Sequence, residues 1–203
     1  MRSAEFDREH VLRSAMNEFI AKGYNKTSMQ DLKRVTGLHP GSIYCAFENK
    51  RGLLLAALAH YAETKSQAFE QFFDDPQRIL SGFERYLRDM IEFNECDYGQ
   101  GCLLQKSLSE LNHQDEEVEQ IICNMLAQWK NNIQMKLELA RKNGEISEEA
   151  DCDLLSDFLV MSIYGLRSFA STKPSEARLV QLVDMVMRCL KNGGIEKPIN
   201  AIV

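Results

Sequence analysis

A cysteine with a lysine one helical turn later is the first place in the chain where the residue types suggest covalent chemistry. Cys102 follows Gly101 at the predicted start of a short helix, and Lys106 lies four residues on. A helix N-terminus and a nearby ammonium group both favour thiolate over thiol, which lowers the pKa and promotes attack on electrophiles or peroxides. Cys96 lies six residues earlier and could convert a sulfenic acid on Cys102 into a disulfide. The alternative is that Cys102 is buried and only packs, because buried thiols are inert.

A second group of polar residues, between Thr27 and Lys50, is suited to nucleic acid. Apolar residues at helical spacing predict a helix that begins after Thr27 or Ser28 and ends at Gly37, and a shorter helix that begins at Pro40. Two short helices this close predict a helix-turn-helix, whose second helix enters the major groove of DNA. By spacing alone, an ordinary helical hairpin fits equally well. The candidates for base edges are His39, Gly41, Ser42 and Cys45, and those for phosphates are Thr27, Lys33, Tyr44 and Lys50.

The segments that would position these residues all have helical periodicity, and no strand pattern, internal repeat or low-complexity segment is present. Gly and Pro residues mark most of the predicted ends. We therefore predict an all-α fold of about nine helices. Besides the two short helices, the predicted helices cover about residues 4–22, 50–73, 79–95, 103–112, 116–143, 147–171 and 174–192.

The last two predicted helices are apolar around most of their circumference. A helix at the edge of a monomer would expose such a surface to water, so both helices need cover on a second side. A core position inside a larger monomer would also explain the pattern, but the chain has few other elements. We therefore predict a homodimer through these two helices.

The second half of the chain also contains apolar and aromatic residues that could line a pocket between helices for an unknown small-molecule effector. For each of them, simple core packing is the alternative. The candidates are Phe83, Tyr86, Met90, Phe93, Met125, Trp129, Met161 and Tyr164.

Composition and charge restrict the class of protein. The chain has 203 residues, 44% of them hydrophobic, and a formal net charge of −6. Residues 1–50 hold eight Lys or Arg against six Asp or Glu, a net +2, and the remaining 16 against 24 give −8, so the basic end carries the helix-turn-helix pattern. No signal-peptide or membrane-spanning pattern is present, and we expect a cytoplasmic protein with no membrane partner.

The six cysteines and four histidines do not form a recognisable metal or catalytic pattern. No CxxC pair and no Gly-rich phosphate loop is present, and the histidines are scattered. We expect free thiols, no metal and no cofactor. A cysteine-dependent redox enzyme, or a small-molecule carrier without DNA binding, stays as the alternative to a DNA-binding protein.

The sequence of residues 19–58 resembles the DNA-binding domain of the TetR family of bacterial transcriptional regulators. The matching features are Phe19, Gly23, Tyr24 and Thr27, then Gly37, the run from Gly41 to Tyr44, Phe47, Lys50 and Leu53-Leu54. The resemblance implies a three-helix DNA-binding domain, with Phe19 and Tyr24 in its core, over residues 1–49. It also implies a C-terminal ligand-sensing and dimerisation domain over residues 50–203, in which the last two helices form a four-helix bundle with a second copy. The positions expected to meet DNA are Thr27, His39, Pro40, Gly41, Ser42, Tyr44 and Lys50.

The sequence departs from the family pattern at His39-Pro40 and at Cys45-Ala46. These departures affect the prediction of the operator sequence and not the prediction of DNA binding. The segment from Gly101 to Glu110, with Cys102 and Lys106, is similar to the N-ethylmaleimide-repressor-like subgroup, some of which sense electrophiles or oxidants by cysteine. The resemblance thus implies a homodimeric repressor that binds a palindromic double-stranded operator and is released by a small-molecule or thiol-reactive signal.

Overall fold

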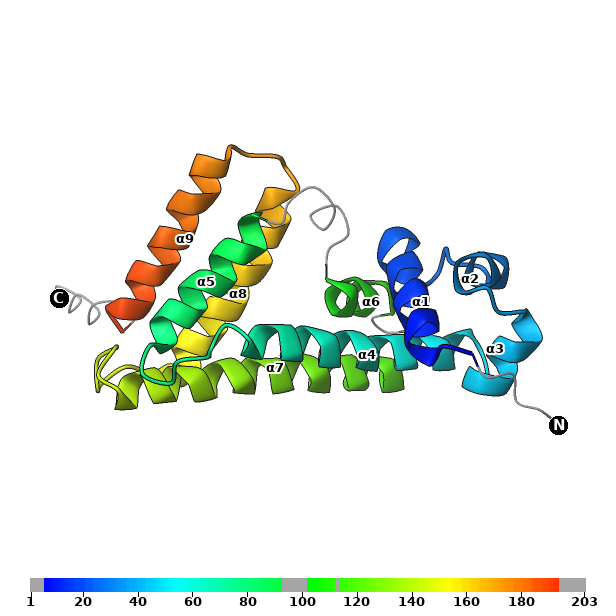
Figure 1. Cartoon of the computed structure of the whole chain (residues 1–203), viewed down its shortest axis with the longest axis horizontal. Coiled ribbons are helices and arrows are strands. Elements are labelled where there is room, and N and C mark those ends of the chain that lie inside the picture. The colour runs from blue at the N-terminus through cyan, green and yellow to red at the C-terminus, as the bar shows by residue number, and fades with distance from the viewer. Residues whose placement is uncertain (1–5, 93–101, 112–113, 194–203) are drawn as a thin grey trace, which may run out of the picture. The chain divides into compact units, whose positions relative to one another are not determined.

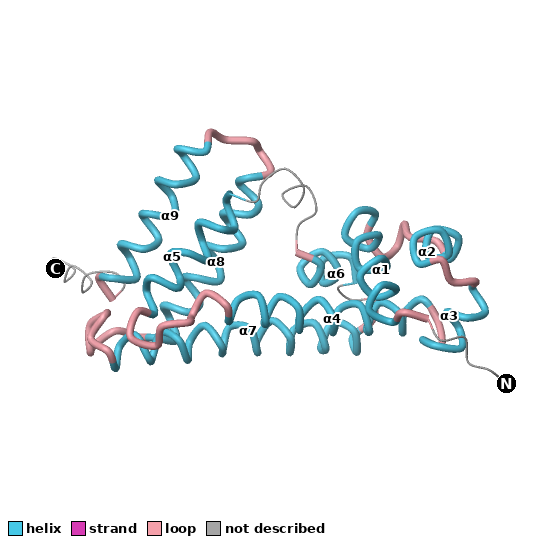
Figure 2. The backbone as a smooth tube through the Cα atoms, viewed as in Figure 1, coloured by secondary structure: helices cyan, strands magenta, loops and turns pink. Residues whose placement is uncertain are grey.

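The computed structural model describes residues 6–92, 102–111 and 114–193. Within these ranges the chain forms α-helices and connecting loops and contains no strand (Figures 1 and 2). The prediction of an all-α fold with about nine helices is confirmed. The helices are α1 (Arg8–Lys22), α2 (Met29–Thr36), α3 (Pro40–Phe47), α4 (Lys50–Glu70), α5 (Ile79–Glu92), α6 (Leu103–Leu111), α7 (Glu116–Lys142), α8 (Cys152–Ala170) and α9 (Glu176–Lys191).

The chain packs as two compact units. The first contains Met1–Ser66 and Gln100–Leu126, and the second contains Gln67–Gly99 and Ala127–Val203. The division falls within α4 and α7, so each of these helices contributes to both units. The domain boundary predicted between residues 49 and 50 divides a DNA-binding domain from a ligand-sensing domain and not one packed unit from the other. It stays a prediction.

Side-chain caps set the helix starts in the first unit. The Asp7 carboxylate accepts the His10 N–H at 3.0 Å, so α1 begins at Arg8 and not near residue 4. Ser28 and Asp31 form a reciprocal capping box at the start of α2. α2 ends as predicted at Gly37, whose φ of 71° is left-handed.

The core of the first unit brings the helix-turn-helix together with α1, α4, α6 and the beginning of α7. Phe19 is buried as expected, whereas Tyr24 is half-buried with its ring 6.0 Å from that of Phe19. The two short helices are held by apolar side chains and not by local propensity, because eight-residue helices are unstable alone. The buried anchors include Leu32, Ile43, Phe47, Leu54, Leu58, Leu103, Leu104 and Ile122.

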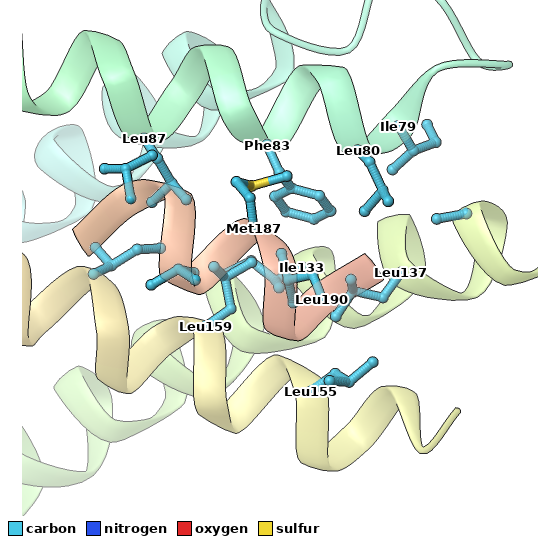
Figure 3. Packing of buried hydrophobic residues seen from close by; sticks show 14 of the residues in the cluster. Ile79, Leu80, Phe83, Leu87, Ile133, Leu137, Leu155, Leu159, Met187 and Leu190 are labelled. Atoms are coloured by element: carbon cyan, nitrogen blue, oxygen red, sulfur yellow. The ribbon is translucent and has the colours of Figure 1, made fainter. Parts of the chain in front are cut away.

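The second unit is organised around an apolar cluster contributed by α5, α7, α8 and α9. Figure 3 shows labelled side chains of the four helices pointing toward one another in this cluster. The Glu145 carboxylate accepts the N–H groups of Ile79 and Leu80 at 2.8 and 3.0 Å, which satisfies two donors at the start of α5.

Three helix bounds in this part of the chain differ from the sequence prediction. α9 begins at Glu176 and not at Pro174, because the Ser175 hydroxyl accepts the Arg178 N–H and caps the helix there. α4 ends at Glu70, three residues before the predicted end. α8 begins at Cys152 and not near Ser147, because the Asp151 side chain accepts from the N–H groups at 153 and 154 and fixes the cap there. None of the helices in the described ranges is long and apolar enough to cross a membrane.

Candidate functional site

The short helix α3 has one face in the core and one face open to solvent. Ile43 and Phe47 are buried with exposed fractions of 0% and 5%. His39, Tyr44 and Cys45 are exposed, with Tyr44 at 49%. The helix therefore presents to solvent a row of polar side chains from the positions that the sequence predicts for DNA contact.

Gly41 lies on this open face, and the fold does not need a glycine there. A Cβ built at Gly41 meets no atom of the described residues within 4 Å, apart from its own helix backbone and chain neighbours. Glycine inside a helix costs roughly 0.5–1 kcal/mol relative to alanine. The missing side chain is explained if another molecule approaches the backbone closely at this point.

Pro40 and His39 set the start of the same helix. Pro40 occupies the first turn, as predicted, where a missing N–H is tolerated. His39 is at the N-cap, and its side chain makes no capping hydrogen bond. The imidazole is therefore available to an outside partner, and Ser42 lies half-buried beside it in the first turn.

The predicted phosphate contacts differ in how the structure places them. Lys33 is exposed, and the Lys50 ammonium lies 4.3 Å from the centroid of the Tyr24 ring, where burial lowers its pKa. Thr27 is buried with 1% exposed, and its hydroxyl donates to the Gly23 carbonyl at 2.6 Å. That buried bond assigns the Thr27 side chain to holding the turn before α2, and its phosphate contact stays a prediction.

Several charged side chains of the first unit pair with each other. Lys22 contacts Glu18 at 2.8 Å and Asp31 at 2.5 Å. The bond from Lys22, together with those from Ser28, holds the pKa of Asp31 well below its usual range. The Arg51 Nε atom donates to Asp115 at 2.5 Å, which lowers the pKa of Asp115 to about 2. Sequence reasoning did not identify the Arg51–Asp115 pair, because its members are 64 residues apart.

The structure places the candidate sensor thiol in the core of the first unit. Cys102 is buried with 9% exposed, immediately before α6. The Lys106 Nζ atom donates to the Ile20 carbonyl at 2.6 Å, so the ammonium group binds the C-terminal end of α1. Cys96 lies outside the described residues. The burial favours the packing alternative, and thiol sensing stays a prediction.

The other described cysteines are not in disulfides: Cys45, Cys123 and Cys189 are exposed, and Cys152 is buried. Burial also raises the pKa of the Cys152 thiol. In the described ranges, no group of three or more His, Cys, Asp or Glu side chains is placed to hold a metal ion.

The structure brings together only part of the predicted effector pocket. The Trp129 and Tyr164 rings lie 5.7 Å apart, and Tyr86 and Met90 pack half-buried against the same core. Phe83 is fully buried, Met161 is 63% exposed, Met125 packs in the first unit, and Phe93 lies outside the described residues.

Arg167 is a polar residue beside this group that sequence reasoning missed. It follows Tyr164 by three residues on the same face of α8, and its Nε atom contacts the Met90 sulfur at 3.4 Å. The sequence feature that could have identified Arg167 is a basic residue within the apolar segment that forms α8. Tyr86, Met90, Trp129, Tyr164 and Arg167 are here called the α5/α7/α8 cluster. Within it the Trp129 and Tyr164 rings pack on each other and Arg167 contacts Met90, while the Tyr86 ring packs on Phe69 and Phe72.

Two family models match the chain. The model described as "Bacterial regulatory proteins, tetR family" covers residues 11–57. The model described as "Tetracyclin repressor-like, C-terminal domain" covers residues 76–186.

Individual relatives match over most of their length. The chain is 28% identical over 185 residues to the HTH-type transcriptional repressor ComR of Escherichia coli (strain K12), with 90% of this chain and 88% of that protein covered. It is 25% identical to the HTH-type transcriptional repressor DhaR of Mycobacterium sp. (strain GP1), with 90% and 91% covered. Among solved structures, a CifR cysteine mutant bound to a 26-bp double-stranded operator superposes with a TM-score of 0.76 at 26% identity, with 93% of this chain and 98% of that chain covered.

Proposed function

The chain belongs to the TetR family of bacterial regulatory proteins, and on that premise we propose that it represses transcription by binding a palindromic operator as a homodimer. It is a DNA-binding regulator and not an enzyme. The observation that carries the proposed binding mode is the open face of α3, where polar side chains surround a glycine that the fold does not require.

In this proposal α3 lies in the major groove. His39, Gly41, Ser42 and Cys45 face base edges, and Lys33, Tyr44 and Lys50 contact phosphates, which set the register without reading sequence. Pro40 shapes the start of the helix, and buried Thr27 supports the turn before α2.

The test of this binding mode is selection of a duplex from a random library by the wild-type protein, followed by titration at several salt concentrations. We expect a two-fold symmetric site and an affinity that falls steeply with salt. His39→Ala should change the preferred base at one position of each half-site, a discrimination of about 1–3 kcal/mol, without changing the salt dependence. Selection of no duplex at low salt would refute the proposed function.

Exposed apolar residues on α8 and α9 support dimerisation through these helices. Leu154, Met161 and Phe169 on α8 are 62%, 63% and 41% exposed, and Met185 on α9 is 55% exposed. Gly165 lies on the same face of α8 and has open space around it, which permits close approach of another helix. A second copy that covers this face would remove the apolar surface from water.

Sedimentation of two matched variants tests this interface. Met161→Glu should shift the protein from dimer to monomer and weaken binding to the palindrome, because one half-site would then be read at a time. Met135→Glu is the control: Met135 is equally exposed at 65% but lies on α7, and this variant should stay dimeric. A dimeric Met161→Glu variant would place the interface elsewhere.

For the signal, we propose that a small molecule binds at the α5/α7/α8 cluster and shifts the protein toward a form with lower operator affinity. The aromatic and thioether side chains suit an apolar body, and the Arg167 guanidinium suits an acidic group. Trp129 is the single tryptophan of the chain, so its fluorescence reports directly on this cluster. Aromatic carboxylic acids should change that fluorescence and release DNA, whereas their methyl esters should do so less, and identical responses would exclude Arg167.

Release by a thiol-reactive compound is the second signal that the sequence predicts. Cys102→Ser should keep DNA binding and lose release by N-ethylmaleimide or hypochlorite. Unchanged release would leave Cys102 with its packing role alone.

A further inference from the structure

α6 belongs to one domain by its sequence and to the other by its packing. Its residues match the family model of the C-terminal domain, which covers residues 76–186. In the structure, α6 instead packs on α1 within the first unit, together with the helix-turn-helix (Figure 1). Two charged side chains of α6, Lys106 and Glu110, reach the end of α1 and the turn that follows it.

Lys106 caps the end of α1 from outside the helix. Its ammonium group donates to the Ile20 carbonyl at 2.6 Å. Ile20 lies in the last turn of α1, where carbonyl groups lack partners within the helix and the helix dipole favours a cation. The bond therefore ties α6 to the C-terminal end of α1.

Glu110 occupies the turn between α1 and α2. Its Oε2 atom accepts the Asn25 N–H at 3.1 Å. A Cβ built on Gly23 would lie 1.9 Å from Glu110 Oε1, so the carboxylate fills the space that a side chain at position 23 would take. Gly23 has φ 84° and ψ 161°, a conformation that is essentially restricted to glycine. The turn and the carboxylate are thus fitted to each other.

The same turn determines where the helix-turn-helix lies. Thr27 in this turn bonds back to the Gly23 carbonyl, and Ser28 directly after it caps α2, which packs on α3. Glu110 also acts electrostatically on Lys50, a predicted phosphate contact. The Glu110 carboxylate fixes the turn and thereby the position of α2 and α3, although Glu110 itself lies on neither helix.

We propose that Glu110, supported by Lys106, is a positioning residue for DNA recognition: it fixes the α1–α2 turn, and through it the orientation in which α3 is presented to the groove. The inference rests on the proposed function and adds to it a residue that reads no base and contacts no phosphate.

Three variants of the full-length protein test this role: Glu110→Ala, Glu110→Gln and Ser109→Ala. Glutamine keeps an oxygen that can accept from Asn25 but removes the charge, and Ser109 is an exposed neighbour on α6. The probes are the duplex selected by the wild-type protein and a shuffled duplex of the same composition. Thermal unfolding of each variant is recorded alongside both affinities.

We expect Glu110→Ala to bind the selected duplex about tenfold more weakly, the size of one lost hydrogen bond to a charged group, and the shuffled duplex with little change. Glu110→Gln and Ser109→Ala should lie within about twofold of wild type. The direction of the change in affinity is informative, because removing a negative charge near DNA should by itself tighten binding. Loss of folded protein would lower both affinities in proportion and leave their ratio unchanged.

Three results would overturn the inference. These are an unchanged ratio of affinities in Glu110→Ala when its thermal unfolding matches that of wild type, equal tightening by both Glu110 variants, and a Glu110→Gln variant as weak as Glu110→Ala. If the wild-type protein selects no duplex, the proposed function fails as well. If it selects one and Glu110→Ala behaves as wild type, only the positioning role fails.

Discussion

The α1–α2 turn and the helix α3 are neighbours in sequence and use their polar residues in opposite ways. In the turn, the polar groups of Thr27, Asn25 and Ser28 have partners within the chain, and the Glu110 carboxylate lies where a side chain at position 23 would go. On α3, in contrast, the open face carries His39 without a capping bond and Gly41 with open space.

This difference separates residues that build the site from residues that use it. A polar group that is satisfied inside the protein contributes to the folded geometry, and its loss should appear as lost stability. A polar or glycine residue that makes no contact needed by the fold lowers stability or leaves it unchanged. Substituting such a residue should therefore weaken DNA binding and not stability. Four substitutions, given from the largest expected effect to the smallest, test this separation.

Gly23→Ala should reduce the free energy of unfolding by about 2–4 kcal/mol, because alanine is strained at this backbone conformation and its Cβ displaces the Glu110 carboxylate. Chemical denaturation followed by circular dichroism measures the change. A stability within about 0.5 kcal/mol of wild type would show that the turn is not tightly fitted.

Gly41→Ala is the matched substitution on the open face. It should leave the free energy of unfolding unchanged or raise it by about 0.5–1 kcal/mol, because alanine is the better helix former. Affinity for the selected duplex should fall about tenfold or more, since the added methyl group separates α3 from the groove. If binding is retained while stability falls, Gly41 belongs with the turn and the comparison is wrong.

Lys50→Ala should weaken binding to the selected and the shuffled duplex alike, and lower the slope of log affinity against log salt by about 1. Lys142→Ala, an exposed lysine in the second unit, is the control and should leave the slope unchanged. An unchanged slope in Lys50→Ala would leave this lysine with only its contact on the Tyr24 ring.

Asp115→Asn tests a contact that builds the first unit, with the smallest expected effect. The pKa of Asp115 is about 2 in the folded protein because of Arg51, below the value of about 3.9 for an unfolded chain. The contact therefore stabilises the fold above about pH 4 and is lost as the pH falls toward 2. The variant should lose at most about 1 kcal/mol at pH 7 and show a shallower acid decline of Tm; identical pH profiles would contradict this.

The sequence predicted the elements of the site well, because their signals are local. Ser28, Gly37 and Pro40 carry the cap, stop and start signals of two helices, and each does so in the structure. The errors at α1 and α8 are also local: Asp7 and Asp151 are capping residues within sequence segments that read as helix.

The contacts that the sequence did not predict join residues that lie far apart in the chain or in different units. Lys106 was predicted to activate Cys102, but its ammonium group bonds to Ile20, 86 residues away. Met125 and Trp129 were predicted to share a pocket, although they belong to different units. Helical periodicity gives the face of a residue on its own helix, and it does not give the helix against which that face packs.

The sequence by itself determined an all-helical chain with a short pair of helices, the second of which has one apolar face and one polar face, because caps, stops and periodicity act over a few residues. Only the tertiary structure decided that Thr27 is interior, that the space beside Gly41 is open whereas the Glu110 carboxylate lies against Gly23, and that α6 packs with the helix-turn-helix. The contacts of α6 with α1 and the following turn join residues 85 and 86 positions apart in the sequence, and no short-range pattern encodes such contacts.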